Sequence, residues 1–214
     1  MPYAYDEGNK SVKLQLSNRP GPGATLGAQT PRAATITNGA QATFHFQAAS
    51  SATVYETTGN LSITAVLNIP GGTTPTNITV DVTDVGGGSA TSATDYSAVG
   101  TVTLTFPAGS SNGATQVFNL GVLADANVEG NETVNLQLSN IIGTGATLGA
   151  QTTHTATITD DDQATVQFQA ASSATVNETA GNLAITAVLN IPSGTTPTNI
   201  THDVTYLGAG SAPS

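Results

Sequence analysis

The sequence predicts an all-β fold built from seven-stranded, immunoglobulin-like Greek-key sandwich modules in tandem. Three observations lead to this fold class: short stretches rich in β-branched residues, the lack of an apolar stripe at helical spacing, and a long internal repeat. The composition indicates an ordered chain, because 38% of the residues are hydrophobic and only 8% are charged. Disordered chains usually combine high charge with few β-branched residues, whereas this chain is rich in threonine, valine and isoleucine.

Seven short strands are expected in the central part of the chain. Each is alternating or β-branched and is bounded by Gly, Pro, Asn or Ser. They cover Thr43–Gln47, Asn60–Ile69, Asn77–Thr83, Thr101–Phe106, Thr115–Val122, Glu132–Leu138 and Thr153–Thr159, and two further strands, Ser11–Leu16 and Arg32–Thr37, are expected before them. Seven strands in about 120 residues are typical of a two-sheet Greek-key sandwich.

An internal repeat sets the expected domain organisation. Residues 41–90 match residues 163–212 at 40 of 50 positions, which is an offset of 122. The same offset carries residues 23–30 onto residues 145–152 without a change. We therefore expect three parts: the C-terminal part of one module at 1–40, a complete module at 41–162, and the N-terminal part of the next module at 163–214. This arrangement suggests a window on a longer repetitive array.

Charge is scarce and unevenly distributed. The chain has 14 acidic and 4 basic residues, and all the basic residues lie within the first 32 positions. Such an acidic chain is a poor match for nucleic acid or anionic membranes, because both need clustered cations. The lack of cysteine excludes disulfides, thiolate nucleophiles and cysteine-ligated zinc. The apolar runs are too short to cross a bilayer, so we expect no membrane insertion.

Two motifs resemble known metal-binding or catalytic loops, but their context argues against both. Residues 125–130 begin like an EF-hand loop, yet position twelve is Leu136 and no helices flank it. Residues 109–113 match G-x-S-x-G, but Asn112-Gly113 predicts a hairpin turn and no helix follows. The histidines do not correspond between the repeats. We therefore expect no catalytic site, and an enzyme is the weakest class of function.

The acidic residues of the central module fall in loops that can meet at one end of a Greek-key sandwich. They are Glu56, Asp95, Asp125, Glu129, Glu132, Asp160, Asp161 and Asp162. Because no Lys or Arg follows Arg32, these carboxylates repel one another unless a cation lies between them. Carboxylate oxygens on flexible loops suit Ca²⁺ better than Mg²⁺ or a transition metal. The alternative interpretation is plain solubilising surface charge.

The residues around these acids resemble the Calx-beta domain family. The resemblance rests on residues 95–109, residues 125–132 and the stretch from Leu138 to the closing Asp160-Asp161-Asp162. The family has a seven-stranded sandwich that binds calcium at one tip, in exchanger regulatory domains and in large bacterial surface proteins. The resemblance implies that the eight acidic residues above are calcium ligands. Ala124-Asp125 replaces the paired aspartates of many members, so we expect about one to three ions.

The flanking copies differ from the central module at the acidic positions. Lys10 stands where the central module has Glu132, and Asn38-Gly39-Ala40 replaces the three aspartates. A cation at this place opposes calcium, so we expect the first tip to be metal-free. The C-terminal copy retains Glu178 but not the equivalent of Asp95, and we expect no site from it alone.

Near-identical repeats favour an extracellular, calcium-binding structural or adhesive repeat in a long array or fibre at the cell surface. The expected partners are neighbouring copies of the chain, arranged head to tail, and other cell-surface components. The alternative is an intracellular calcium-sensing regulatory domain of a membrane transporter, as in the exchanger domains.

Overall fold

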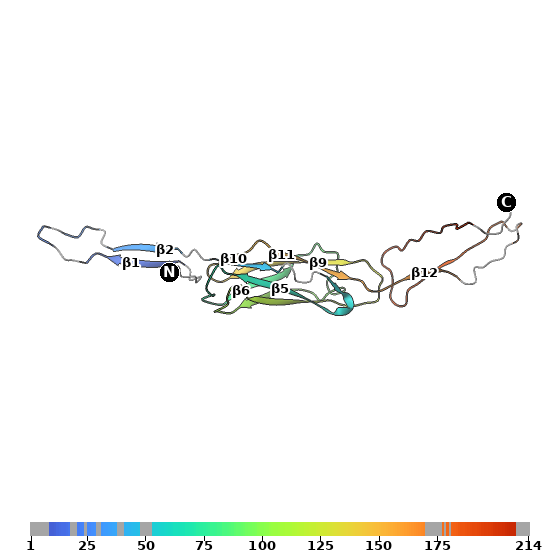
Figure 1. The fold of residues 1–214 in the computed structure, drawn as a ribbon, viewed down its shortest axis with the longest axis horizontal. Helices are drawn as coiled ribbons and strands as arrows, with labels where there is room; N and C mark the ends of the chain where they lie inside the picture. Colours follow the sequence, from blue (N-terminus) through green and yellow to red (C-terminus); the bar gives the residue numbers. More distant parts are fainter. Residues whose placement is uncertain are drawn as a thin grey trace.

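The computed structural model describes residues 9–17, 21–23, 25–28, 31–37, 41–47, 53–169, 177, 179 and 181–208. These residues form a central β-sandwich with a two-stranded ribbon extending from each end (Figure 1). The only helix with named bounds among them is the 3-10 turn η1, Glu56–Thr58, and none of their helices is long and apolar enough to cross a membrane. The predicted all-β sandwich is therefore confirmed.

The sandwich consists of a four-stranded and a five-stranded sheet. The first has the order β10 (Ala146–Leu148), β3 (Ala42–Phe46), β5 (Asn60–Asn68) and β8 (Thr115–Gly121). The second has the order β4 (Thr53–Tyr55), β11 (Thr153–Thr159), β9 (Glu132–Ile142), β6 (Ile78–Asp84) and β7 (Val102–Phe106). The pairs β10–β3 and β4–β11 are parallel, and the other neighbouring strands are antiparallel.

All seven strands expected in the central part of the chain form, and their ends agree to within one residue except in β9, which continues to Ile142. The structure adds β4 and β10, which have three residues each. Strands this short show no period-two alternation, so the sequence pattern cannot reveal them. Both are edge strands, and each joins a neighbour in parallel.

Alternating side chains from both sheets form the core. In β9, Val134, Leu136 and Leu138 are buried while the residues between them are partly exposed. Phe44 of β3 meets Phe106 of β7 across the two sheets, with ring centroids 4.9 Å apart. Each such large side chain stabilises the fold by about 1.5–3 kcal/mol when fully buried.

A two-stranded ribbon lies before the sandwich and another lies after it. At the N-terminal end β1 (Lys10–Gln15) pairs with β2 (Pro31–Ile36), and at the C-terminal end β12 (Thr165–Phe168) pairs with β13 (Ala187–Asn190). Through the offset of 122, β1–β2 corresponds to β9–β11 and β12–β13 corresponds to β3–β5. The strands of both ribbons are exposed along almost their whole length.

Candidate metal centre

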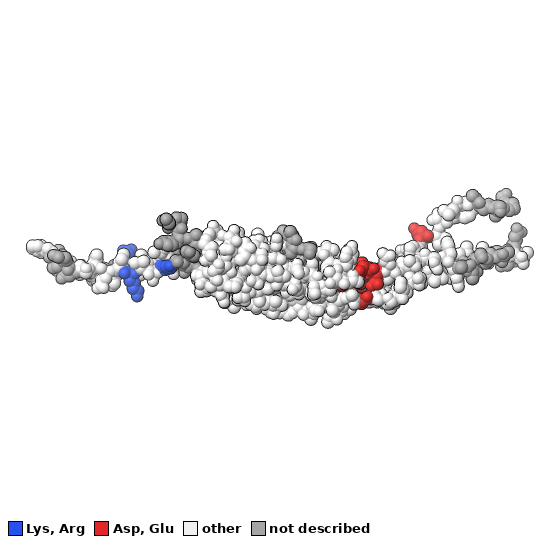
Figure 2. All heavy atoms as spheres, turned by 60° about the horizontal axis from the view of Figure 1, so that its bottom comes forward, with Lys and Arg blue, Asp and Glu red and all other residues white. Residues whose placement is uncertain are grey.

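Strand pairing brings acidic residues from distant parts of the sequence to one end of the sandwich. β4 runs parallel to β11, and Tyr55 at the end of β4 pairs with Thr159 at the end of β11. The next residues along the two strands are Glu56 and Asp160, so both leave the sheet at the same edge. Figure 2 shows Asp and Glu side chains gathered at the end of the sandwich that faces the C-terminal ribbon.

The remaining acidic residues reach this end by two other routes. Glu132 is the first residue of β9, opposite Ile158 of β11. Asp95 precedes Tyr96, which forms an isolated bridge with Val122, the residue directly after β8. Since β8 leads directly into the loop that carries Asp125 and Glu129, that loop and Asp95 lie at the same end.

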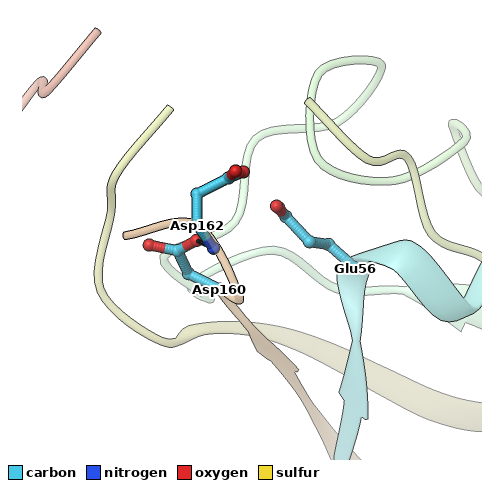
Figure 3. A group of neighbouring side chains, drawn as sticks. All are labelled: Glu56, Asp160 and Asp162. Carbon is cyan, nitrogen blue, oxygen red and sulfur yellow. Dashed lines mark hydrogen bonds between the residues drawn. The ribbon is translucent and has the colours of Figure 1, made fainter. Parts of the chain in front are cut away.

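Six carboxylates form two groups of three. The first comprises Glu56, Asp160 and Asp162, and the second comprises Asp95, Glu129 and Glu132. Within each group the ligand oxygens lie within 4.8 Å of one another. Figure 3 shows the first group, in which the side chains of Glu56 and Asp162 point toward each other. The backbone N–H of Glu129 donates to Asp160 Oδ2 at 2.5 Å, which links the two groups.

Two of the expected ligands lie outside these groups. Asp161 is exposed, and its Oδ2 accepts a hydrogen bond from the hydroxyl of Thr57 at 2.6 Å. Asp125 accepts from the backbone N–H of Asn127 at 2.6 Å and from its side-chain amide at 3.0 Å. The charge of Asp125 nevertheless raises the pKa values of glutamates in both groups, so it acts on each of them.

The two groups are electrostatically strained. Burial, a hydrogen bond with Asp162 and the charge of Asp160 raise the pKa of Glu56 to about 8. Burial, a hydrogen bond with Asp95 and the charge of Asp95 raise the pKa of Glu132 to about 7. Burial and neighbouring charges also raise the pKa of Glu129. Without a cation, these glutamates therefore hold protons more tightly than exposed glutamates do.

The site residues fit a hard divalent cation. Glu56 Oε1 is buried and has no hydrogen-bond partner among the described residues. No Lys or Arg occurs anywhere from Ala33 to Ser214, so no cationic side chain of this part of the chain can neutralise the carboxylates. The donor atoms of both groups are carboxylate oxygens, which are the ligands that Ca²⁺ prefers.

Two further acidic residues of the module have structural roles instead. Asp81 accepts hydrogen bonds from the hydroxyl of Thr103 at 2.6 Å and from the side-chain amide of Asn140 at 2.7 Å, which lower its pKa. Asp84 Oδ2 accepts from the hydroxyl of Tyr96 at 2.5 Å. Neutral donors therefore satisfy these two carboxylates.

The loop that carries Asp125 and Glu129 also contacts the C-terminal part of the chain, a contact that was not expected from the sequence. The backbone N–H of Val128 donates to the carbonyl of Thr195 at 2.8 Å. The backbone N–H and the hydroxyl of Thr195 donate to Asn127 Oδ1 at 3.1 and 2.7 Å. Asn127 thus connects Asp125 to the segment that follows β13.

A sequence signal for this contact exists in the repeat. The preceding copy has Tyr3 and Tyr5 where the central module has Asp125 and Asn127, so the acid and the amide are replaced together. Lys10, the expected replacement for Glu132, lies in β1. Asn38–Ala40 and Glu178, which the sequence singles out in the flanking copies, lie outside the described residues.

Comparisons with known proteins identify a family. A family model described as the Calx-beta domain matches residues 38–162. The crystal structure of the apo-form Calx CBD1 domain is 22% identical over 57% of this chain and 99% of its own, with a TM-score of 0.46. A structure of CBD12 from CALX1.2 is 26% identical over 56% of this chain and 44% of its own, with a TM-score of 0.46.

A third structure, the calcium binding domain CBD12 of CALX1.1, is 25% identical over 51% of this chain and 41% of its own, with a TM-score of 0.40. The match therefore spans less than half of each CBD12 structure. No curated protein matches the chain. The resemblance to the Calx-beta family is confirmed, and so is calcium as the ion, because residues 38–162 match the Calx-beta domain and the chain has two acidic groups that can hold a metal.

The comparisons also correct two predictions. An extracellular structural or adhesive repeat in a surface array or fibre is wrong, because the match of residues 38–162 to the Calx-beta domain favours the alternative, a calcium-sensing regulatory domain. The predicted cell-surface location is wrong for the same reason. Near-identical repeats show only that modules were duplicated, and duplication does not distinguish a surface array from a regulatory tandem.

Proposed function

Because the chain belongs to the Calx-beta domain family, we propose that its central module is a calcium-sensing regulatory domain of a membrane transporter. The observation that carries this proposal is the meeting of two carboxylate groups at the end of the module that contacts its successor. We propose a regulatory and not an enzymatic role. Residues 109–113, which match a nucleophile motif, lie in turns between β7 and β8 with no helix after them.

The six grouped carboxylates are the proposed ligands. Asp125, whose charge raises the pKa values of glutamates in both groups, is a further proposed ligand, and Asp161 lies at the edge of the site. A bound Ca²⁺ would supply the positive charge that this part of the chain lacks. The protein contributes the arrangement: β4 and β11 hold Glu56 and Asp160 side by side, and the backbone of Glu129 fixes Asp160. Glu56 and Glu132 have to release their protons before they can act as ligands.

A calcium sensor has to convert ion binding into a structural change elsewhere in the protein. We propose that this change occurs at the contact between the central module and the C-terminal ribbon. Asp125 holds Asn127, and Asn127 holds Thr195 of the next module. Without a cation, the clustered carboxylates repel one another at this joint, because unpaired like charges are costly in partly buried surroundings. Neutralising these carboxylates favours the contact between Asn127 and Thr195. Ca²⁺ therefore fixes the angle between the central module and the C-terminal ribbon.

Calcium binding is testable with a matched pair of variants. Isothermal titration of the 214-residue protein should show Ca²⁺ binding, and Mg²⁺ should bind more weakly because it dehydrates reluctantly. Asp160→Asn should lower the calcium affinity by about tenfold or more, a loss of about 1.4 kcal/mol, because Asp160 belongs to a carboxylate group. Asp161→Asn removes the same charge one residue away and should change the affinity by less than about threefold. Equal losses in both variants would contradict the assignment, and an absence of binding by the wild type would contradict the function.

The contact between the central module and the C-terminal ribbon can be tested with a substitution at Gly194, which lies directly before Thr195. A Cβ at this glycine would overlap with the carbonyl of Ala126, and its backbone has φ +72°. Gly194→Ala should separate the ribbon from the tip, so that X-ray scattering shows a broader distance distribution that calcium no longer narrows. Gly181→Ala is the control, because Gly181 also has positive φ but no atom lies within 4 Å of its added Cβ. Identical scattering of the wild type with and without calcium would argue against the coupling.

A further inference from the structure

The loop that leads from β6 to Asp95 is tied to the start of β9 by three hydrogen bonds. The backbone N–H of Ser89 donates to the hydroxyl oxygen of Thr133 at 3.2 Å, and the backbone N–H of Thr133 donates to the hydroxyl oxygen of Ser89 at 3.0 Å. The backbone N–H of Ala90 donates to the carbonyl of Thr133 at 3.0 Å. We call these three hydrogen bonds the Ser89–Thr133 latch.

A glycine directly before Ser89 allows the loop to approach β9 this closely. A Cβ at Gly88 would lie 2.1 Å from the carbonyl oxygen of Thr133 and 3.2 Å from Cα of Val134. Gly88 is not among the glycines with positive φ, so the lack of space, and not the backbone conformation, requires glycine at this position. The backbone of the loop therefore lies directly on the backbone of β9.

The latch lies between two members of the second carboxylate group. Glu132 directly precedes Thr133 in β9. Thr91 directly follows Ala90, and its backbone N–H donates to Asp95 Oδ2 at 2.5 Å. The carboxylates of Glu132 and Asp95 belong to one group, whose ligand oxygens lie within 4.8 Å of one another. A short path of covalent bonds and hydrogen bonds therefore connects the two carboxylates through the latch.

Other contacts hold the backbone around Asp95 but not its carboxylate. The backbone N–H of Leu123 donates to the carbonyl of Asp95 at 2.9 Å. The hydroxyl of Tyr96 donates to Asp84 Oδ2 at 2.5 Å, which ties the two ends of the loop together. Neither hydrogen bond involves the carboxylate of Asp95, whereas the N–H of Thr91 donates to it directly. The direction of this carboxylate therefore depends on the position of Thr91, which the latch holds.

We propose that the Ser89–Thr133 latch sets the calcium affinity of the second carboxylate group, because it fixes the spacing between Asp95 and Glu132. Ser89 and Thr133 are positioning residues, since they act through the ligands and do not bind the ion themselves. This inference rests on the calcium site proposed above. Removing a group that orients a metal ligand typically lowers metal affinity by about 10–100-fold.

The first carboxylate group provides an internal reference. Glu56 directly follows β4, and Asp160 and Asp162 lie in the segment after β11, so none of them is attached to the latch. A latch that only stabilises the sandwich would act on both groups alike. A latch that positions ligands acts on the second group alone.

Isothermal titration of the 214-residue protein with Ca²⁺ tests the proposal. Thr133→Val removes the hydroxyl and retains the branched shape, and it should lower the calcium affinity of the second group by about tenfold. Thr133→Ser retains the hydroxyl and should bind calcium within about threefold of the wild type. Serine is an accepted residue at this position of the fold, because the equivalent residue of β1 is Ser11.

Two backgrounds separate the groups. In an Asp162→Asn background, which weakens the first group, Thr133→Val should still lower the affinity by about tenfold. In a Glu132→Gln background, which disables the second group, Thr133→Val should change the affinity by less than about threefold. Non-additivity of this kind is expected only where the two substitutions affect the same site.

Two control substitutions separate positioning from stability. Thr103→Val removes a hydroxyl from another strand of the same sheet, where it donates to Asp81. It should lower the melting temperature in chelator and leave the calcium affinity unchanged. Gly88→Ala should reproduce the loss of affinity, because its Cβ pushes the loop away from β9. Gly100→Ala is its control, since no described atom lies within 4 Å of the added Cβ and Gly100 has no positive φ.

The outcomes distinguish this inference from the function on which it rests. A loss of affinity that is equal in the two backgrounds would overturn the positioning role. Wild-type calcium binding that Thr133→Val leaves unchanged would also overturn it, while the proposed function would stand. A wild type that binds no calcium would overturn both.

Discussion

Saturating Ca²⁺ is expected to raise the melting temperature of the central module by about 10 °C over its value in chelator. Binding to the native state alone adds about 2.7 kcal/mol at one hundred times Kd, and that free energy corresponds to this shift for a domain of about 120 residues. The effect is large because the module folds around two carboxylate groups that repel one another. Differential scanning calorimetry in chelator and in calcium measures it.

The variant Glu56→Gln tests the same prediction, because its melting temperature should differ from that of the wild type in chelator, and its gain in calcium should differ as well. In chelator, the variant should melt at a higher temperature than the wild type, because a neutral amide replaces a buried carboxylate that lies among other acids. In calcium, its gain in melting temperature should be smaller, because one ligand is missing. Asp203→Asn removes an equal charge in the C-terminal ribbon and should leave both melting temperatures unchanged. Equal melting of the wild type in calcium and in chelator would contradict the site.

In chelator, the stability of the module is expected to fall as the pH rises from about 6.5 to about 8. The folded-state pKa values of Glu132 and Glu56, about 7 and about 8, lie above the ordinary glutamate pKa of 4.5, so the folded state binds protons more tightly than the unfolded state. This contribution to stability is complete below the unfolded pKa and is lost as the pH rises through the folded pKa. Calcium should remove the trend, because it takes the place of the protons.

Two other groups, whose titration makes stability rise with pH, titrate below this pH range. Burial lowers the pKa of His154 from its ordinary value of 6.5, so its effect on stability appears only as the pH falls below about that value. Hydrogen bonds from Thr103 and Asn140 lower the pKa of Asp81, which acts at still lower pH. Urea unfolding at several pH values measures the slope, and a Glu56→Gln/Glu132→Gln double variant should flatten it. A wild type that gains stability over this window in chelator would refute the electrostatic description of the site.

The sequence by itself determined the elements and the chemistry of the site. Period-two alternation between turn residues is local, so it located the seven main strands of the sandwich from single stretches such as Glu132–Leu138. The scarcity of charge made the acidic loop residues informative, and their hard oxygen donors pointed to Ca²⁺. The repeat offset of 122 also identified the N-terminal strands, which form as β1 and β2.

The tertiary structure alone decided which acids act together. Glu56 and Asp160 are far apart in the sequence and meet because β4 pairs in parallel with β11. β4 has only three residues, which are too few for a sequence pattern to predict this pairing. Asp161 and Asp162 are neighbours with the same side chain, yet only Asp162 joins a group, while Asp161 accepts a hydrogen bond from the hydroxyl of Thr57. The contact between Asn127 and Thr195 likewise depends on how the segment after β13 packs against the central sandwich, since side chains so distant in the sequence are brought together only by packing.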